Sequence, residues 1–379
     1  MCGYDKTMRP VKLNEKTIVV KFHLVLKYFT YDINSEILSL DSWVTVSWID
    51  QHLRWTPSDY DNIKQIHLSN SDIWVPDLSV YNSHDQSTDP ALITNTRCIV
   101  NYNGFVICVP SSHVDALCVA DLTKYPFDTQ NCTVRFGSWV HKGEELDIRY
   151  RKPILVLDDL VPNGEWELEK FNAYRNPGHY DCCPNSTYPT VTLSLKINRL
   201  HGAHTASVII PAIVGIILTI TSLVMKPDKD RLTLCLANLI AQFLHMQYVS
   251  WMIPLKGNVV PQLIVLARDS LLLCALTIVF TIVIKSLSEK KTTPPVWMSS
   301  TISFVISCKV GQFLILNDHS VRGVATAKGE EDGSTIIDNT EDHSTTNSQD
   351  WRIFASILDR LIFLSYVIVY FTLVIAFIP

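Results

Sequence analysis

The chain has 379 residues and a small net charge of −5, and 47% of its residues are hydrophobic while 18% are charged. Soluble domains carry about 25% charged residues, so this composition favours a membrane protein. The charge is too small and too evenly spread to form the basic face that nucleic-acid binding requires.

Residues 1–202 have the pattern of an all-β domain. Bulky side chains nearly alternate with smaller ones from Ser42 to Trp48, as expected for a half-buried strand. Asn103-Gly104 lies between two apolar runs and predicts a hairpin turn. Turn clusters recur between such segments, so we expect about ten short strands in a β-sandwich.

Four apolar runs in the second half of the chain are long enough to cross a bilayer as helices. They cover residues 206–225, 232–253, 262–284 and 361–378. One such run alone would also suit a buried core helix, but four after a polar half predict a membrane bundle. Three membrane helices are expected within 203–286, and a pre-membrane helix with the fourth within 351–379.

Ten cysteines are spread along the chain. A disulfide between Cys118 and Cys132 would enclose 13 residues and stabilise the fold by about 3 kcal/mol. Cys98 and Cys108 lie symmetrically about Asn103, which leaves open a bridge across the hairpin or two buried thiols.

Cys182 and Cys183 are adjacent, and a disulfide between them would close a small, strained ring. Their spacing alone leaves a bridge and two separate thiols equally open. Cys235, Cys274 and Cys308 fall in or below the predicted membrane segments and are expected to be reduced.

Two sequons predict N-linked glycans at Asn131 and Asn185, which favours an extracellular first domain. The first residues of the chain lack the apolar stretch of a signal peptide. We therefore expect that such a peptide was removed or replaced.

Several motifs follow one another in a fixed order along almost the whole chain. They are Trp48-Ile49-Asp50 to Trp55, Ile73-Trp74-x-Pro76-Asp77, Tyr125-Pro126-Phe127-Asp128 between Cys118 and Cys132, Gly137-Ser138-Trp139, Asn163-Gly164-Glu165-Trp166, Tyr180-x-Cys182-Cys183-x4-Tyr188, Pro211, Pro254-x6-Pro261 and Leu358-Asp359-Arg360-Leu361. Together they resemble the subunits of nicotinic acetylcholine receptors, which are Cys-loop ligand-gated ion channels.

The resemblance implies a multi-pass plasma-membrane protein of synapses, with an extracellular sandwich and a four-helix membrane domain, assembled as a pentamer with four further subunits in the lipid bilayer. It implies a short amphipathic helix after Pro294-Pro295 in a cytoplasmic loop spanning 287–350. Within that loop, 328–349 is polar enough to predict disorder. No protease, Walker or hydrolase motif is present in the sequence, so we expect no enzyme activity, cofactor or metal.

The resemblance also implies an agonist site between subunits. One face would carry Tyr81, Trp139, Tyr180 and Tyr188, with a Cys182–Cys183 disulfide at the tip of a capping flap, and the neighbouring subunit would add Trp48. Electron-rich rings attract a quaternary ammonium by about 0.5–2 kcal/mol each. Both faces occur in one chain, so a homopentamer could form complete sites, although a silent subunit that needs a different partner fits equally.

Three features argue against acetylcholine itself as the agonist. His141 and Lys142 add positive potential beside Trp139, and a glycan at Asn185 would crowd the flap. A bridged Cys98–Cys108 pair would stiffen the strands of the complementary face. Another amine, or an amphiphile, is therefore the alternative agonist.

In the register that the resemblance implies, the second membrane helix lines the pore. The residues facing the axis would be Asp230, Thr233, Ala237, Ile240, Leu244, Gln247 and Trp251. Rings of Ile240 and Leu244 could stop ions by dewetting, and a ring of Asp230 carboxylates would favour permeant cations. Lys229 and Arg231 beside Asp230 weaken that inference, so an anion channel stays open.

The most polar stripe of this helix, formed by Asn238, Gln242 and His245, points almost opposite to that pore face. These residues either line the pore or pack inside the bundle. We favour a buried network that joins His245 to Asp269 of the third run.

The resemblance implies that gating passes from the agonist site to the pore through three parts of the chain. They are Phe127 in the loop between Cys118 and Cys132, Arg199 before the first membrane helix, and the 256–260 linker ahead of Pro261.

Overall fold

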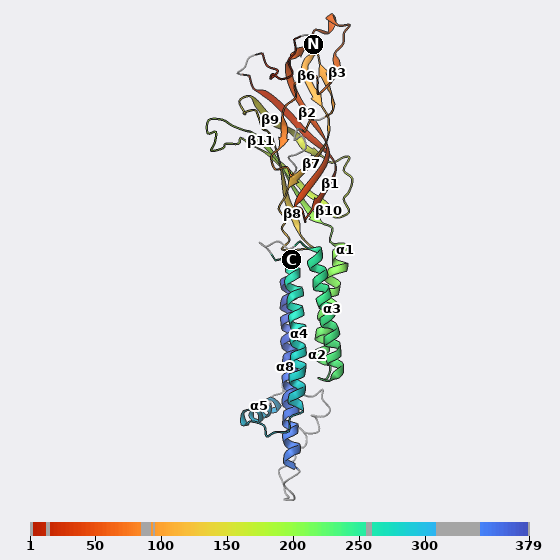
Figure 1. Ribbon diagram of the computed structural model, residues 1–379, viewed down its shortest axis with the longest axis vertical. Coiled ribbons are helices and arrows are strands. Elements are labelled where there is room, and N and C mark those ends of the chain that lie inside the picture. The colour runs from red at the N-terminus through yellow and green to blue at the C-terminus, as the bar shows by residue number, and fades with distance from the viewer. Residues whose placement is uncertain are drawn as a thin grey trace. The chain divides into compact units, whose positions relative to one another are not determined.

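The computed structural model describes residues 3–12, 16–84, 92–93, 95–254, 260–307 and 342–377. The predictions for Cys308, for 256–259 of the linker and for disorder over 328–341 lie outside these residues. The chain divides into two compact units, which are described separately (Figure 1). One consists of Met1–Leu122 with Pro126–His201, and the other of Thr123–Tyr125 with Gly202–Pro379.

The first unit is all-β, as predicted, with eleven strands in its described part. They are β1 (Ile18–Asp32), β2 (Ile37–Arg54), β3 (Gln65–Ser69), β4 (Leu78–Val80), β5 (Arg97–Asn101), β6 (Asn103–Cys108), β7 (Ser111–Leu117), β8 (Thr129–Ser138), β9 (Leu146–Val156), β10 (Trp166–Asn176) and β11 (Thr190–Arg199). A single 3₁₀ turn, Pro57–Asp59, follows β2.

These strands form the two sheets of a sandwich. The larger sheet has the order β3-β5-β6-β2-β1-β9, with β7 pairing along the first half of β2. The smaller has the order β10-β11-β8-β4. Only β1 and β9 pair in parallel among the described strands.

Period-two alternation explains how the sheets build a core. Along β2 the even-numbered residues from Leu38 to Trp48 are buried, and the odd-numbered ones face outward. Phe22 of β1 meets Phe136 of β8 across the core, with ring centroids 5.2 Å apart. The hairpin predicted at Asn103-Gly104 joins β5 to β6 and pairs Cys98 directly with Cys108, and these two are bridged.

The second unit is helical. Its elements are α1 (Gly202–His204), a π-helical turn (Thr205–Ile209), α2 (Ile210–Val224), α3 (Lys229–Met252), α4 (Gln262–Ser288), α5 (Val296–Ser307) and α8 (Asp342–Phe377). Four stretches are long and apolar enough to cross a membrane: Gly202–Val224, Lys229–Met252, Gln262–Ser288 and Ser348–Phe377. The helices α2, α3, α4 and α8 lie side by side (Figure 1).

The last helix corrects one prediction. Disorder was expected to extend to residue 349, but α8 already begins at Asp342. Its apolar residues Trp351, Ile353 and Ile357 pack against Met298 and Ile302 of α5. A helix nucleated by this packing extends at little cost into the polar residues before it, because propagation is easier than nucleation.

Candidate functional site

Strand pairing brings Tyr81 and Trp139 together. β4 pairs with β8, and Tyr81 and Trp139 immediately follow these two strands. Their ring centroids lie 5.8 Å apart with an edge-on angle of 84°. The Tyr81 hydroxyl donates a hydrogen bond to the carbonyl of Ser138, at 2.5 Å. The Tyr81 ring lies so close to the backbone of Gly137 that a Cβ there would sit 2.6 Å from Cζ.

A flap formed by residues 177–189 between β10 and β11 carries the second pair of rings. Tyr180 and Tyr188 have centroids 6.1 Å apart. The amide of Tyr188 donates to the carbonyl of Gly178 at 2.8 Å and closes the neck of the flap. Gly178 has a φ of +66°, and a Cβ there would meet the Tyr188 carbonyl oxygen, so this position requires glycine.

The two ring pairs belong to one neighbourhood, which we call the ring cluster (Tyr81, Trp139, Tyr180 and Tyr188). Burial raises the pKa of Tyr81 to about 12, and the nearby Tyr180 and Tyr188 add to the rise. The flap is also tied to the loop after Trp139, because the amide of Gly143 donates to the carbonyl of Thr187 at 2.7 Å. Trp139 remains 77% exposed, so the cluster has an open side.

The Asp77 carboxylate fixes the segment around Trp139, residues 138–141, through three contacts. Asp77 accepts hydrogen bonds from the Ser138 hydroxyl at 2.7 Å and from the Val140 amide at 2.8 Å, and its Oδ1 lies 2.8 Å from Nδ1 of His141. Burial tends to raise the pKa of the Asp77 carboxyl, but the hydrogen bonds from His141 and Ser138 outweigh it and lower that pKa. The positive potential predicted from His141 is therefore balanced by its partner, while Lys142 is exposed.

Trp48 was wrongly predicted to lie on the complementary face. It is 1% exposed and packs in the core, with its ring centroid 6.0 Å from that of Trp74. The exposed tryptophan of β2 is Trp43, which is 41% exposed. Trp43 and Trp48 are five residues apart, and an odd separation puts two residues on opposite faces of a strand. Trp48 shares its face with the buried Val44 and Val46, so that face is the one that packs in the core.

The predicted bridge between Cys182 and Cys183 is also absent from the structure. Their sulfur atoms lie 2.9 Å apart, whereas a disulfide bond is about 2.05 Å long. In the structure both residues are therefore free thiols. The hydrogen bond with Cys183 raises the pKa of the Cys182 thiol.

Residues 1–201 match the family model described as the neurotransmitter-gated ion-channel ligand binding domain. The chain belongs to the neurotransmitter-gated ion channels. The chain is 27% identical to the neuronal acetylcholine receptor subunit alpha-5 of Gallus gallus, over 97% of this chain and 84% of that one. The alpha-5 subunit of Homo sapiens is 26% identical over 94% of this chain and 80% of its own length. The alpha-2 subunit of Gallus gallus is 29% identical over 79% of this chain and 57% of its own length.

These similarities confirm the predicted kinship with nicotinic receptor subunits. The chain is a channel subunit rather than an enzyme. It is a multi-pass plasma-membrane protein, and its N-terminal ligand-binding domain is extracellular. The predicted glycosylation sites, Asn131 and Asn185, are both exposed on that domain.

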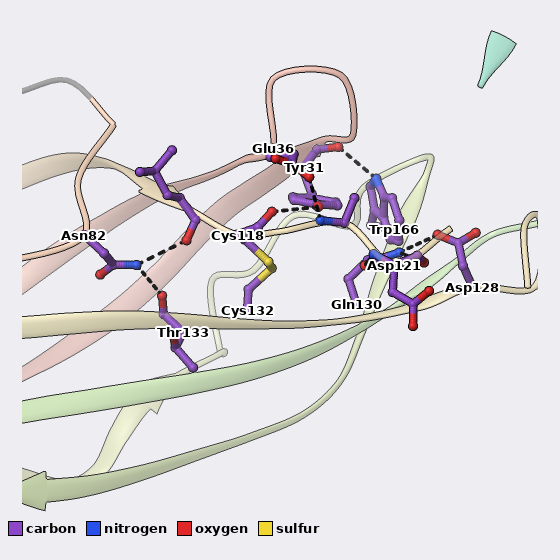
Figure 2. The surroundings of a disulfide bond; sticks show 12 residues. Tyr31, Glu36, Asn82, Cys118, Asp121, Asp128, Gln130, Cys132, Thr133 and Trp166 are labelled. Carbon is purple, nitrogen blue, oxygen red and sulfur yellow. Dashed lines mark hydrogen bonds between the residues drawn. A yellow bond between two sulfur atoms is a disulfide. The ribbon is translucent and has the colours of Figure 1, made fainter. Parts of the chain in front are cut away.

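The loop that gives many such channels their name is closed here by a disulfide between Cys118 and Cys132 (Figure 2). The Tyr31 hydroxyl donates to the carbonyl of Cys118 at 2.9 Å, and the indole of Trp166 donates to the carbonyl of Tyr31 at 3.1 Å. Gln130 donates to the Asp128 carboxylate at 2.7 Å. The loop is therefore anchored to the sandwich at both of its ends.

Arg199 at the end of β11 joins this loop through a buried ion pair. Its Nε and Nη2 donate to the two oxygens of Asp128 at 2.8 and 3.1 Å, and both side chains are 1% exposed. Its guanidinium also stacks on Trp166, 4.2 Å from the ring centroid. Phe127 packs with its ring centroid 4.8 Å from that of His201.

The helix α3 has two chemically distinct faces. All seven residues predicted to line the pore are exposed in the single chain: Asp230, Thr233, Ala237, Ile240, Leu244, Gln247 and Trp251. The opposite face is buried and polar. Asn238 donates to the Thr219 hydroxyl at 2.9 Å, Gln242 donates to the carbonyl of Gly215 at 3.1 Å, and Ser270 donates to Gln242 at 3.0 Å.

The predicted His245–Asp269 contact is wrong, although Asn238 and Gln242 do pack inside the bundle. Nε2 of His245 lies 2.9 Å from the carbonyl oxygen of Val208, in the π-helical turn where the regular helical ladder is interrupted. Asp269 instead accepts from its neighbour Arg268 at 2.8 Å. The prediction relied on the similar depth of His245 and Asp269 in the membrane, and depth does not determine the direction in which a side chain points.

Proposed function

We propose that this chain forms a cation-selective channel that opens when an ammonium ligand binds the ring cluster at an interface between subunits. The observation that carries the proposal is the gathering of four aromatic rings, one of them the exposed Trp139, in the ring cluster. A quaternary ammonium cannot discard its charge by losing a proton, and each ring face attracts it by about 0.5–2 kcal/mol.

The complementary face of the neighbouring subunit would then present Trp43 instead of Trp48. Trp43 lies on the outward face of β2, the strand already expected to contribute this wall, and its ring is accessible. The Cys98–Cys108 disulfide stiffens the hairpin formed by β5 and β6. This hairpin borders the proposed wall, because β6 pairs with β2. One chain thus offers both halves of a site, which supports a homopentamer.

In this proposal the flap closes over the ligand, and the movement reaches the membrane unit through rigid contacts of the sandwich. The Arg199–Asp128 pair fastens the end of β11 to the disulfide-closed loop, so the two would move together. β11 leads directly into the first membrane helix, and Pro261 stands at the start of α4. The ligand acts only through its higher affinity for the open state.

Five copies of the exposed face of α3 would line the pore. Rings of Ile240 and Leu244 would close it by dewetting until the helices move apart. A ring of Asp230 carboxylates would select cations at one mouth. The positive charge of Arg231 weakens this selectivity less than the sequence suggests, because Arg231 is fully buried and paired with Asp359 at 2.7 Å.

Current recordings from oocytes that express the chain alone test the proposal. Tetramethylammonium should evoke currents, and Trp139→Ala should raise the half-maximal concentration about 10- to 30-fold, as the loss of one strong ring contact implies. Val140→Ala is the matched control, because Val140 is also exposed and keeps its backbone bond to Asp77. Equal responses from the two variants, or silent wild-type protein at the cell surface, would contradict the proposal.

A further inference from the structure

A β-bulge in β1 gives Lys27 an unusual position. The register between β1 and β2 shifts between Leu26, which pairs with Ser42, and Tyr28, which pairs with Asp41. Lys27 is therefore the extra residue of the bulge and has no partner on β2. Bulges of this kind re-aim a side chain that would otherwise follow the regular alternation of the strand.

The bulge directs the Lys27 ammonium onto the exposed tryptophan of the neighbouring strand. Nζ lies 4.5 Å from the ring centroid of Trp43 and donates to the Ser111 hydroxyl at 3.1 Å. The backbone is held as well, because the amide of Val161 donates to the carbonyl of Lys27 at 2.8 Å. The cation is thus fixed over the ring by contacts on two sides.

This ammonium lacks a counter-ion within the part of the chain that the structure describes. No carboxylate among those residues lies within ion-pair distance of Nζ, whereas Lys196 of the same unit has Glu169 as its partner. An ammonium held on an aromatic face without an anion attracts a carboxylate from a ligand, and charge-assisted hydrogen bonds of this type are among the stronger ones.

We propose that Lys27 is a ligand-binding residue of the complementary face and selects ammonium ligands that also carry a carboxylate. The inference rests on the proposed function, which places Trp43 opposite the ring cluster of the next subunit. A ligand with a cation alone would meet like charge at Trp43, because Lys27 already occupies that ring. A zwitterion would put its ammonium in the ring cluster and its carboxylate against Lys27, and like-charge contacts are a common means of rejecting the wrong partner.

A purely structural role for Lys27 makes a different prediction. If the contact with Trp43 only fastened β1 to β2, replacing Lys27 would lower the melting temperature and leave the preference among ligands unchanged. A changed preference among ligands therefore indicates that Lys27 binds the ligand, whereas a lowered melting temperature measures how much Lys27 contributes to the stability of the fold.

Two ligands with the same cationic head make the comparison. Tetramethylammonium is a cation alone, whereas trimethylglycine has a trimethylammonium group and a carboxylate. Binding of each to the purified full-length protein is measured by calorimetry for wild type, Lys27→Gln, Lys27→Arg and Lys21→Gln. Lys21 is an exposed lysine of the same strand and serves as the matched control.

Wild type should bind trimethylglycine about tenfold more tightly than tetramethylammonium, a ratio typical of one charge-assisted contact. Lys27→Gln should abolish or reverse that ratio, Lys27→Arg should retain it, and Lys21→Gln should match wild type. An unchanged ratio in Lys27→Gln, or a wild type that binds neither ligand or prefers tetramethylammonium, would overturn the inference. The proposed function is judged separately, by whether tetramethylammonium evokes current in cells.

Discussion

An alanine at Gly137 would place its methyl carbon 2.6 Å from Cζ and 2.8 Å from the hydroxyl oxygen of Tyr81. Carbon atoms do not approach that closely, so the Tyr81 ring would have to leave its place over the backbone. The ring would lose its edge contact with Trp139 and its hydrogen bond to Ser138. Gly137→Ala therefore removes one ring of the cluster without touching any ligand directly.

The size of the effect follows from what one ring contributes. A cation–π contact of about 0.5–2 kcal/mol corresponds to about a 2- to 30-fold rise in the half-maximal ligand concentration. Gly164→Ala is the matched control, since no atom lies within 4 Å of a Cβ at that position. Concentration–response curves for ligand-evoked current measure both variants, with surface expression checked by antibody labelling of an extracellular tag.

A double-mutant cycle makes the test specific to Tyr81. Once Tyr81→Ala has removed the ring, Gly137→Ala should cause no further loss, because nothing remains for the methyl group to displace. Two effects that simply add would show that Gly137→Ala acts through some other part of the molecule. If Gly137→Ala or Tyr81→Ala alone gave the wild-type concentration–response curve, the Tyr81 ring would have no role in ligand binding.

Three further predictions concern the sandwich and the membrane unit. Asp359→Asn should leave the Arg231 guanidinium buried without a carboxylate, at a cost of about 3–5 kcal/mol, and should lower the yield of folded protein in size-exclusion profiles, while the joint change Arg231→Met with Asp359→Leu should restore it. The hydrogen bond with Asp41 raises the pKa of His113 above its usual value of 6.5. The contribution of protonated His113 to stability is therefore full below pH 6.5 and is lost as the pH rises through the folded-state pKa. The melting temperature should accordingly drop as the pH rises above 6.5, and His113→Gln should flatten that slope, whereas an unchanged slope would remove His113 as its source. Gly215→Ala should loosen the contact between α2 and α3 and reduce folded yield, because the new methyl group would lie 3.2 Å from a neighbouring glutamine side chain, and full yield would show that this contact relaxes freely.

The sequence was most informative where a pattern is local. Alternation along β2 and the apolar runs predict the sandwich and the membrane helices, because the side-chain period and the helix length are set by the backbone itself. The positions of Tyr81 and Trp139 also follow from short motifs, and the pairing of β4 with β8 then brings the two rings together.

The predictions were wrong where a sequence motif does not determine which face of a strand a residue lies on, or in which direction its side chain points. Trp48 matched an expected pattern, yet its even position puts it with Val44 and Val46 in the core, and parity would have favoured Trp43. His245 and Asp269 lie at similar depth, but the direction of each side chain depends on packing that depth does not determine. Lys27 could not be foreseen, because a bulge depends on the pairing of two whole strands.

The most direct test of the central claim is the reversal potential of a ligand-evoked current in cells that express this chain alone. With tetramethylammonium or trimethylglycine as the ligand, replacing external sodium by a large impermeant cation should shift the reversal potential to negative values. Replacing external chloride should leave it unchanged, because the exposed Asp230 would form the selective ring. A reversal potential that follows chloride, or an evoked current that survives Trp139→Ala unaltered, would contradict a cation channel gated at the ring cluster.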